Sequence, residues 1–154
     1  MAKNEILLGG VQIGFRNFAG KASDYNDEGS RNFVVFLDEQ KAKELEAQGL
    51  NVKWPKPLPE DSTLDPDEDT RQPYLPVAIT FHPYPAKVVI IVDDKAEELD
   101  EGSVDMLDWA QIVNVDLVVR PYHWERKGRS GIKAYTKAIY VTIAQDEFEK
   151  KYGI

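Results

Sequence analysis

The residues most able to do chemistry in this chain are aromatic and basic side chains near its C-terminal end. Residues 121–131 read Pro-Tyr-His-Trp-Glu-Arg-Lys-Gly-Arg-Ser-Gly, and Lys133, Tyr135 and Lys137 follow them. Aromatic rings can stack on unpaired bases, and guanidinium and ammonium groups can neutralise phosphates. This combination of residue types predicts a surface for a single-stranded nucleic acid.

The distribution of charge favours the same interpretation, although the 154-residue chain carries a net charge of −8. Residues 1–59 hold eight acids and eight bases, which cancel. Residues 60–108 hold fourteen acids and three bases, a sum of −11, whereas residues 109–154 hold five acids and eight bases, a sum of +3. Because salt screens exposed charges over about 8 Å, one face can bind a polyanion while another face stays acidic.

Two runs with strand-like composition flank the basic segment and must position it. Residues 113–120 alternate apolar and more polar side chains, and residues 132–143 form a second long strand pattern. The two runs predict a hairpin, in which we expect Gly128 and Gly131 to supply the positive φ of the turn. Tyr135 shares its parity with core-like residues further along, so either a bulge switches the strand face or Tyr135 is buried.

The rest of the chain predicts more strands than helices. Strand patterns cover residues 6–15, with a bend or bulge at Gly9-Gly10, and then residues 31–37, 52–54, 74–81 and 87–92. Helical patterns cover residues 39–48, between Asp38 as N-cap and Gly49, then a short turn from Ser103 to Trp109, and residues 145–152. An acidic, proline-containing loop is expected over residues 55–73.

These elements predict one mainly β domain over residues 1–154. Strands that outnumber the helices and do not alternate with them argue against a βαβ architecture. We expect a five- to six-stranded Greek-key barrel of the oligonucleotide/oligosaccharide-binding (OB) type, with one helix between strands and a long basic hairpin. A β-sandwich with an accessory helix is the alternative.

Most other aromatic residues are expected in the core, namely Phe33, Phe36, Phe81, Trp109 and Tyr140. The side chain of Trp124 has two open alternatives, because its ring can stack on a base or pack against the end of the barrel.

The sequence lacks the motifs of common enzyme and metal sites. It contains no cysteine, and its two histidines, His82 and His123, lie outside any metal-binding motif. Glycine-rich phosphate and dinucleotide motifs are absent, and the acidic run 65–69 lacks the glycine and glutamate of a calcium loop. No run approaches the roughly 20 apolar residues of a membrane helix. We therefore expect no catalysis, metal, cofactor or membrane, in a cytoplasmic protein.

Several segments together carry a resemblance to a known family: residues 29–33, the helix after Leu37-Asp38, and residues 49–53, 74–77, 115–122 with Trp124, and 131–135. Through them the chain resembles phage-type single-stranded DNA-binding proteins with an OB fold. The resemblance implies a protein that coats unpaired DNA in phage replication or recombination, in the cytoplasm of the host bacterium. Replication or recombination proteins are the further partners it implies, and a homo-oligomer is compatible with it.

One departure concerns partner recruitment. Cellular relatives end in an acidic tail that recruits partners, whereas this chain ends Glu-Phe-Glu-Lys-Lys-Tyr-Gly-Ile. Two alternatives stay open: either the acidic loop over residues 60–69 takes over that role, or the chain has no such role.

The predicted phosphate-binding residues are Arg126, Lys127, Arg129, Lys133 and Lys137, and the predicted stacking residues are Tyr122, Trp124 and Tyr135. Further candidates across the sheet are Arg16, Arg31 and Lys53. Two other functions stay open. The overall acidity favours a phage protein–protein adaptor or structural module, and Asp93, Asp94 and Asp105 could hold the divalent metal of a nuclease or hydrolase.

Overall fold

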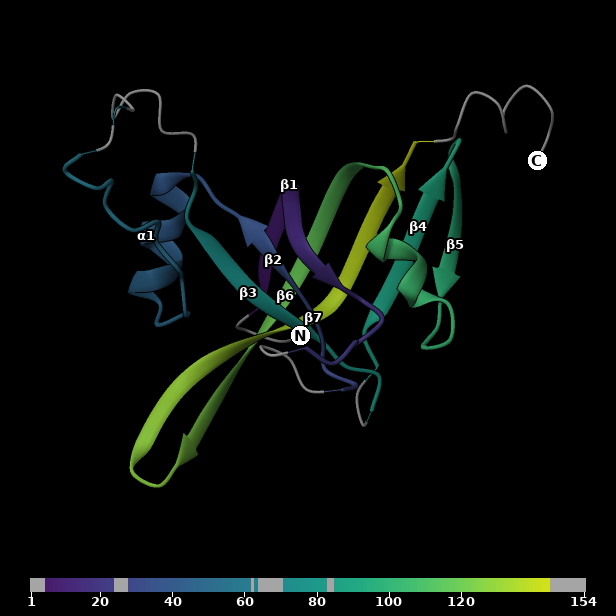
Figure 1. Cartoon of the computed structure of the whole chain (residues 1–154). Helices are drawn as coiled ribbons and strands as arrows, with labels where there is room; N and C mark the ends of the chain where they lie inside the picture. The colour runs from purple at the N-terminus through teal and green to yellow at the C-terminus, as the bar shows by residue number, and fades with distance from the viewer. Residues whose placement is uncertain (1–4, 24–27, 62, 64–70, 83–84, 145–154) are drawn as a thin grey trace.

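The computed structural model describes residues 5–23, 28–61, 63, 71–82 and 85–144 (Figure 1). In chain order the described elements are β1 (Ile6–Asn17), β2 (Arg31–Phe36), α1 (Glu39–Ala47), β3 (Tyr74–Ile79), β4 (Lys87–Val92), β5 (Lys95–Leu99), the 3-10 helix η2 (Val104–Asp108), β6 (Ile112–Arg126) and β7 (Arg129–Ile143). The helix expected over residues 145–152 and the middle of the acidic loop lie outside the described residues.

Five of the strands form a closed barrel of the OB type, which confirms the predicted fold class. The strand order β3-β2-β1-β6-β7 is closed by a parallel contact between β3 and β7, at Ala78 and Tyr135. Alternate residues of each strand face the interior, as in Phe33 and Val35 of β2. The buried side chains form one apolar cluster, in which residues of the barrel strands pack with residues of α1, β4, β5 and η2.

Two further strands extend the sheet beyond the barrel. β4 pairs in parallel with the second half of β7, and β5 pairs with β4 as the outermost strand. Asp93 and Asp94 form the turn between them, with φ of 49° and 64°, the backbone of a two-residue hairpin. The sequence did not predict β5, because Lys95-Ala-Glu-Glu has no apolar alternation and its side chains are exposed. Charged residues of this kind suit an edge strand.

A bulge in β7 changes which alternate residues of the strand face the barrel interior. Val118 pairs with Ala138 but Val119 pairs with Thr136, so Lys137 is the extra residue on β7. The interior therefore receives even-numbered residues before the bulge and odd-numbered residues after it: Ala134 and Thr136, then Ile139 and Val141. Of the two alternatives left open by the sequence, the structure shows the bulge, and Tyr135 is half-buried on the outer side of the barrel.

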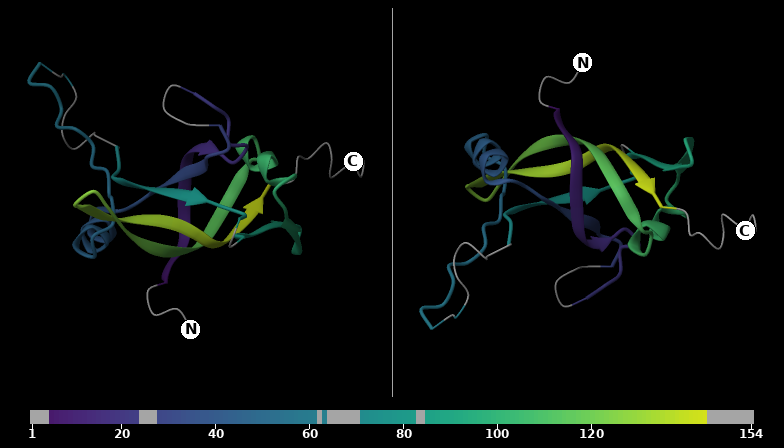
Figure 2. Two further views of the ribbon diagram at one scale, coloured as in Figure 1. Left: turned by 90° about the horizontal axis from the view of Figure 1, so that it is seen from below. Right: turned by 90° about the horizontal axis from the view of Figure 1, so that it is seen from above.

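Helix α1 begins at the predicted residue and ends at Ala47, one residue earlier than predicted, with Gln48 as its C-cap. The Asp38 carboxylate accepts a hydrogen bond of 2.7 Å from the Lys41 backbone N–H, and Gly49 follows the helix with φ of 95°. Leu50 then forms a bridge to Ile132 of β7. The end of α1 therefore supports the β6–β7 hairpin, and both lie at the end of the barrel away from β4 and β5 (Figure 2).

Three sequence predictions need correction. The strand expected over residues 52–54 is reduced to a single bridge between Lys53 and Tyr74. Trp109, expected in the core, is 60% exposed, whereas Val104 and Leu107 are the buried residues of η2. Of the other aromatic residues expected in the core, Phe33 is buried and Phe81 is half-buried and packs against the core cluster. Phe36 and Tyr140 are only half-buried.

Candidate nucleic-acid interface

The paired ends of β6 and β7, residues 122–133, extend beyond the barrel and are called here the hairpin arm (Figure 1). Lys127 and Gly128 form its turn, with φ of 51° and 76°. The prediction of positive φ is thus confirmed for Gly128 and wrong for Gly131. Gly131 instead lies inside β7, directly opposite Trp124.

The absence of a side chain at Gly131 makes room for the Trp124 ring. A Cβ atom at Gly131 would lie 2.8 Å from Cζ2 and 2.9 Å from Cε2 of that ring, closer than real side chains allow. The ring therefore packs against the backbone of its own hairpin. Because it stays 38% exposed, it can still meet a base.

Tyr122 and Lys133 lie on the same face of the arm as Trp124, and Tyr135 continues this face along β7. Opposite residues in an antiparallel pair share a face, and Tyr122 pairs with Lys133. The rings of Tyr122 and Tyr135 meet edge to face, with 6.0 Å between their centroids. The Lys133 ammonium lies 5.2 Å from the centroid of Tyr135. The arm thus presents rings and a cation together, the pair of groups that a single strand needs.

A groove of about 830 Å³ runs between this face of the arm and the barrel. Its walls come from the arm and the start of β7, from β3, from residues 49–51 after α1, and from residues 29–32 at the start of β2. Four of the predicted site residues line it: Arg31, Trp124, Lys133 and Tyr135. Sequence reasoning missed the opposite wall, which includes Pro76 and Ala78, the outward residues of β3.

The remaining predicted cations fall into two groups. Arg126, Lys127 and Arg129 are exposed at the tip of the arm, and Lys53 is exposed beside Tyr74. By contrast, Lys137 forms an ion pair with Glu5. Arg16 donates hydrogen bonds of 2.8 Å to the carbonyl oxygens of Leu107 and Ala110, so it ties β1 to the η2 segment.

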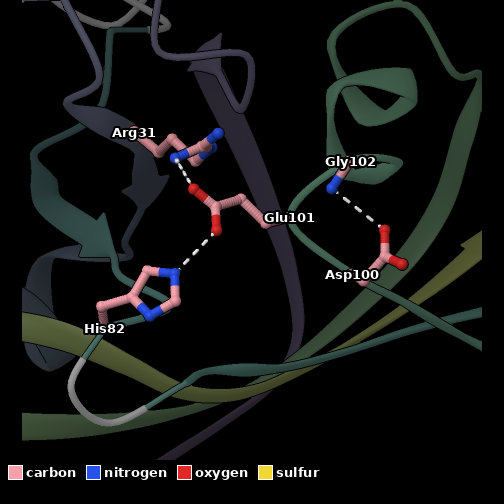
Figure 3. A network of polar contacts seen from close by, with 5 residues as sticks. All are labelled: Arg31, His82, Asp100, Glu101 and Gly102. Carbon is pink, nitrogen blue, oxygen red and sulfur yellow. Dashed lines mark hydrogen bonds and ion pairs between the residues drawn. The ribbon is translucent and has the colours of Figure 1, made fainter.

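Arg31 at the groove wall forms an ion pair with Glu101 (Figure 3). Its Nη1 lies 3.7 Å from Oε1 of Glu101, whose other oxygen lies 2.9 Å from Nε2 of His82. The Arg31 guanidinium also lies 5.6 Å from the centroid of Phe81. Asp100 beside Glu101 accepts a hydrogen bond of 3.0 Å from the Gly102 N–H, which shapes the loop carrying this acid.

The acids considered as ligands of a divalent metal lie in two different elements. Asp93 and Asp94 form the β4–β5 turn, whereas Asp105 lies in η2. Among the described residues, no group of three His, Cys, Asp or Glu side chains could hold a metal ion. Within the same part of the chain, no helix is both long enough and apolar enough to span a membrane.

A family model described as "Putative phage ssDNA-binding domain" matches residues 1–154. Two solved structures share the fold: the single-stranded DNA-binding protein from bacteriophage Enc34 with a C-terminal truncation, and the same protein in complex with ssDNA. Both give a TM-score of 0.55 and cover 92% of this chain, at 12% and 11% sequence identity, and 87% and 88% of the Enc34 chains are covered. No curated protein is significantly similar in sequence.

Proposed function

The chain belongs to the family of phage single-stranded DNA-binding domains, and on that premise we propose that it coats unpaired DNA in phage replication or recombination. The observation that carries the proposal is the groove beside the hairpin arm. There Arg31 of β2 comes together with Trp124, Lys133 and Tyr135 of the β6–β7 hairpin, from which it is distant in sequence. The Enc34 protein, which shares the fold, has been solved with ssDNA.

The groove supports a mechanism with little sequence readout. Every base has a face that can stack on Trp124 or on the Tyr122–Tyr135 pair, so the rings accept any base. Lys133 and the cations at the tip of the arm neutralise phosphates, which carry no sequence information. Both contacts are made to a flexible strand whose bases are unpaired, and a duplex offers no free base faces.

We also propose a domain organisation, a cellular location and partners for the protein. The protein works as one OB domain over residues 1–154, without catalysis, in the cytoplasm of the host bacterium. Replication or recombination proteins are its further partners, and the acidic loop over residues 60–69 is the segment proposed to recruit them.

A fluorescence titration with an oligo-dT at low and high salt tests the proposal, with a duplex of the same length for comparison. The single strand should bind more tightly than the duplex, and binding should weaken as salt rises because counterions are released from the phosphates. Equal or tighter binding of the duplex would contradict the proposal. Absence of any signal at low salt would favour the adaptor function instead.

A further inference from the structure

A second group of aromatic rings lies on the outer face of the barrel, on strands that do not belong to the hairpin arm. Phe15 of β1, Phe36 of β2 and Tyr74 of β3 come from three neighbouring strands. Their ring centroids are 6.0 to 6.3 Å apart in each of the three pairs. Phe15 is nevertheless 72% exposed, so the cluster leaves a large aromatic surface open to solvent.

The backbone at Phe15 is strained, which argues that its exposed ring has a use. Its φ is 46°, a left-handed conformation that is unusual for a bulky residue. The register of β1 against β2 shifts between Gly14 and Asn17, so Phe15 lies in an irregular segment that turns its ring outward. An exposed ring gains little stability from burial, and strain of this kind is concentrated at functional sites.

Gly14 allows the cluster to form. A Cβ atom there would lie 2.6 Å from Cε2 of Phe36, so the Phe36 ring occupies the space above the glycine. A side chain at position 14 would displace Phe36, and Phe15 would lose its neighbour. Two adjacent residues therefore allow the cluster to form: Gly14 leaves space for the Phe36 ring, and the positive φ of Phe15 directs its own ring outward.

The cluster continues the surface of the groove. Tyr74 projects from the same face of β3 as Pro76 and Ala78, which line the groove, because alternate residues of a strand share a face. At about 3.3 Å per residue, Tyr74 lies roughly 7 Å from Pro76 along the strand. Lys53 is exposed and lies directly opposite Tyr74, so its ammonium extends from the same face.

We propose that Phe15, Phe36 and Tyr74 form a second stacking platform, which takes bases of the same DNA strand after it leaves the groove. Lys53 neutralises a phosphate of that segment. The proposal rests on the proposed function and deepens it, because it gives the strand a path along β3 and a footprint longer than the groove. Oligonucleotides that reach the platform should then bind more tightly than those that fill only the groove.

Affinity measured over a series of oligo-dT lengths tests the platform through three substitutions at one residue. Phe15→Leu keeps an apolar side chain but removes the ring. It should lower the affinity for long oligonucleotides by about tenfold, the effect of one lost stacking contact. The shortest oligonucleotides that bind should be unaffected. Phe15→Tyr keeps the ring and should bind all lengths as the unmodified protein does. Phe15→Gly suits the positive φ, so it should fold normally and still lose affinity for long strands.

Val113→Ala serves as the control, because Val113 is 66% exposed on β6 and belongs to neither binding surface. If Phe15→Leu binds every length normally while Trp124→Ala is weakened, the platform is overturned and the groove stands. If the unmodified protein binds no oligonucleotide of any length, the proposed function fails, and the platform fails with it.

Discussion

At the scale of single residues, the position of Trp124 depends on the glycine opposite it in the hairpin arm. Gly131 leaves the space that the indole ring fills, and the ring in turn forms part of the groove wall. A glycine between two strand patterns is usually a turn residue, and sequence reasoning made that assignment for both glycines of the arm. Room for a cross-strand ring gives no local signal, since it depends on the register of the two strands.

The first prediction concerns this contact. In Gly131→Ala the new methyl group would lie 2.8 Å from the Trp124 ring, so the ring must move. Affinity for oligo-dT should fall by about tenfold, the loss expected for one base that no longer stacks. Fluorescence anisotropy measures the change, and thermal unfolding reports how much stability is lost.

Gly9→Ala is the matched control, because a Cβ atom at Gly9 would lie 3.5 Å from Oδ1 of Asp116, an ordinary contact. This variant should bind DNA normally. Normal binding by Gly131→Ala as well would show that the position of the Trp124 ring does not matter for affinity.

At the scale of elements, most strands and the helix follow local sequence patterns, whereas their irregularities do not. The N-cap at Asp38 and the glycine after α1 are local signals, and both were read correctly. The bulge at Lys137 was one of two alternatives. The alternation of residues shows that Tyr135 shares its parity with core residues, but it does not show whether a bulge moves Tyr135 to the outer face or Tyr135 is buried. β5 was missed because its residues reflect an exposed edge and not a buried face.

The second prediction concerns the loop between β5 and η2, which brings Glu101 to Arg31 of β2. Glu101→Gln removes the carboxylate that faces the Arg31 guanidinium at 3.7 Å, so this cation at the groove wall becomes available to phosphate. Affinity for single-stranded DNA should rise by up to about fivefold at low salt, in line with the strength of exposed ion pairs. A titration at two salt concentrations should show that the gain shrinks as salt rises.

Glu98→Gln removes the same charge from the exposed part of β5 and provides the control. If both variants gain affinity equally, the effect is one of net charge, and Arg31 has no particular part in binding.

At the scale of the whole molecule, the barrel was predictable and the groove was not. Counting strands and one intervening helix was enough to indicate the OB type. The groove depends on contacts between distant segments, such as the closure of β3 onto β7 and the bridge from Leu50 to Ile132. For the same reason sequence patterns could not show that Arg16 is used by η2, or that Lys137 is paired with Glu5.

The third prediction uses the separation of charge along the chain. Deleting residues 60–69 removes six acids and no bases, which makes the net charge less negative by six. Affinity for single-stranded DNA should rise at low salt because the polyanion is repelled less. The variant should still unfold cooperatively on heating, since the deleted segment has little apolar content. A broad, non-cooperative transition would show that this segment is needed for the fold.

The central claim is that a single strand binds in the groove beside the hairpin arm, and Trp124→Ala tests it most directly. Affinity for oligo-dT should fall by roughly one to two orders of magnitude, since stacking on one ring contributes about 1–3 kcal/mol. Trp109→Ala removes the same side chain from an exposed site outside the groove, and should bind normally. Both variants should melt close to the unmodified protein. Normal DNA binding by Trp124→Ala, or an equal loss in Trp109→Ala, would contradict the claim.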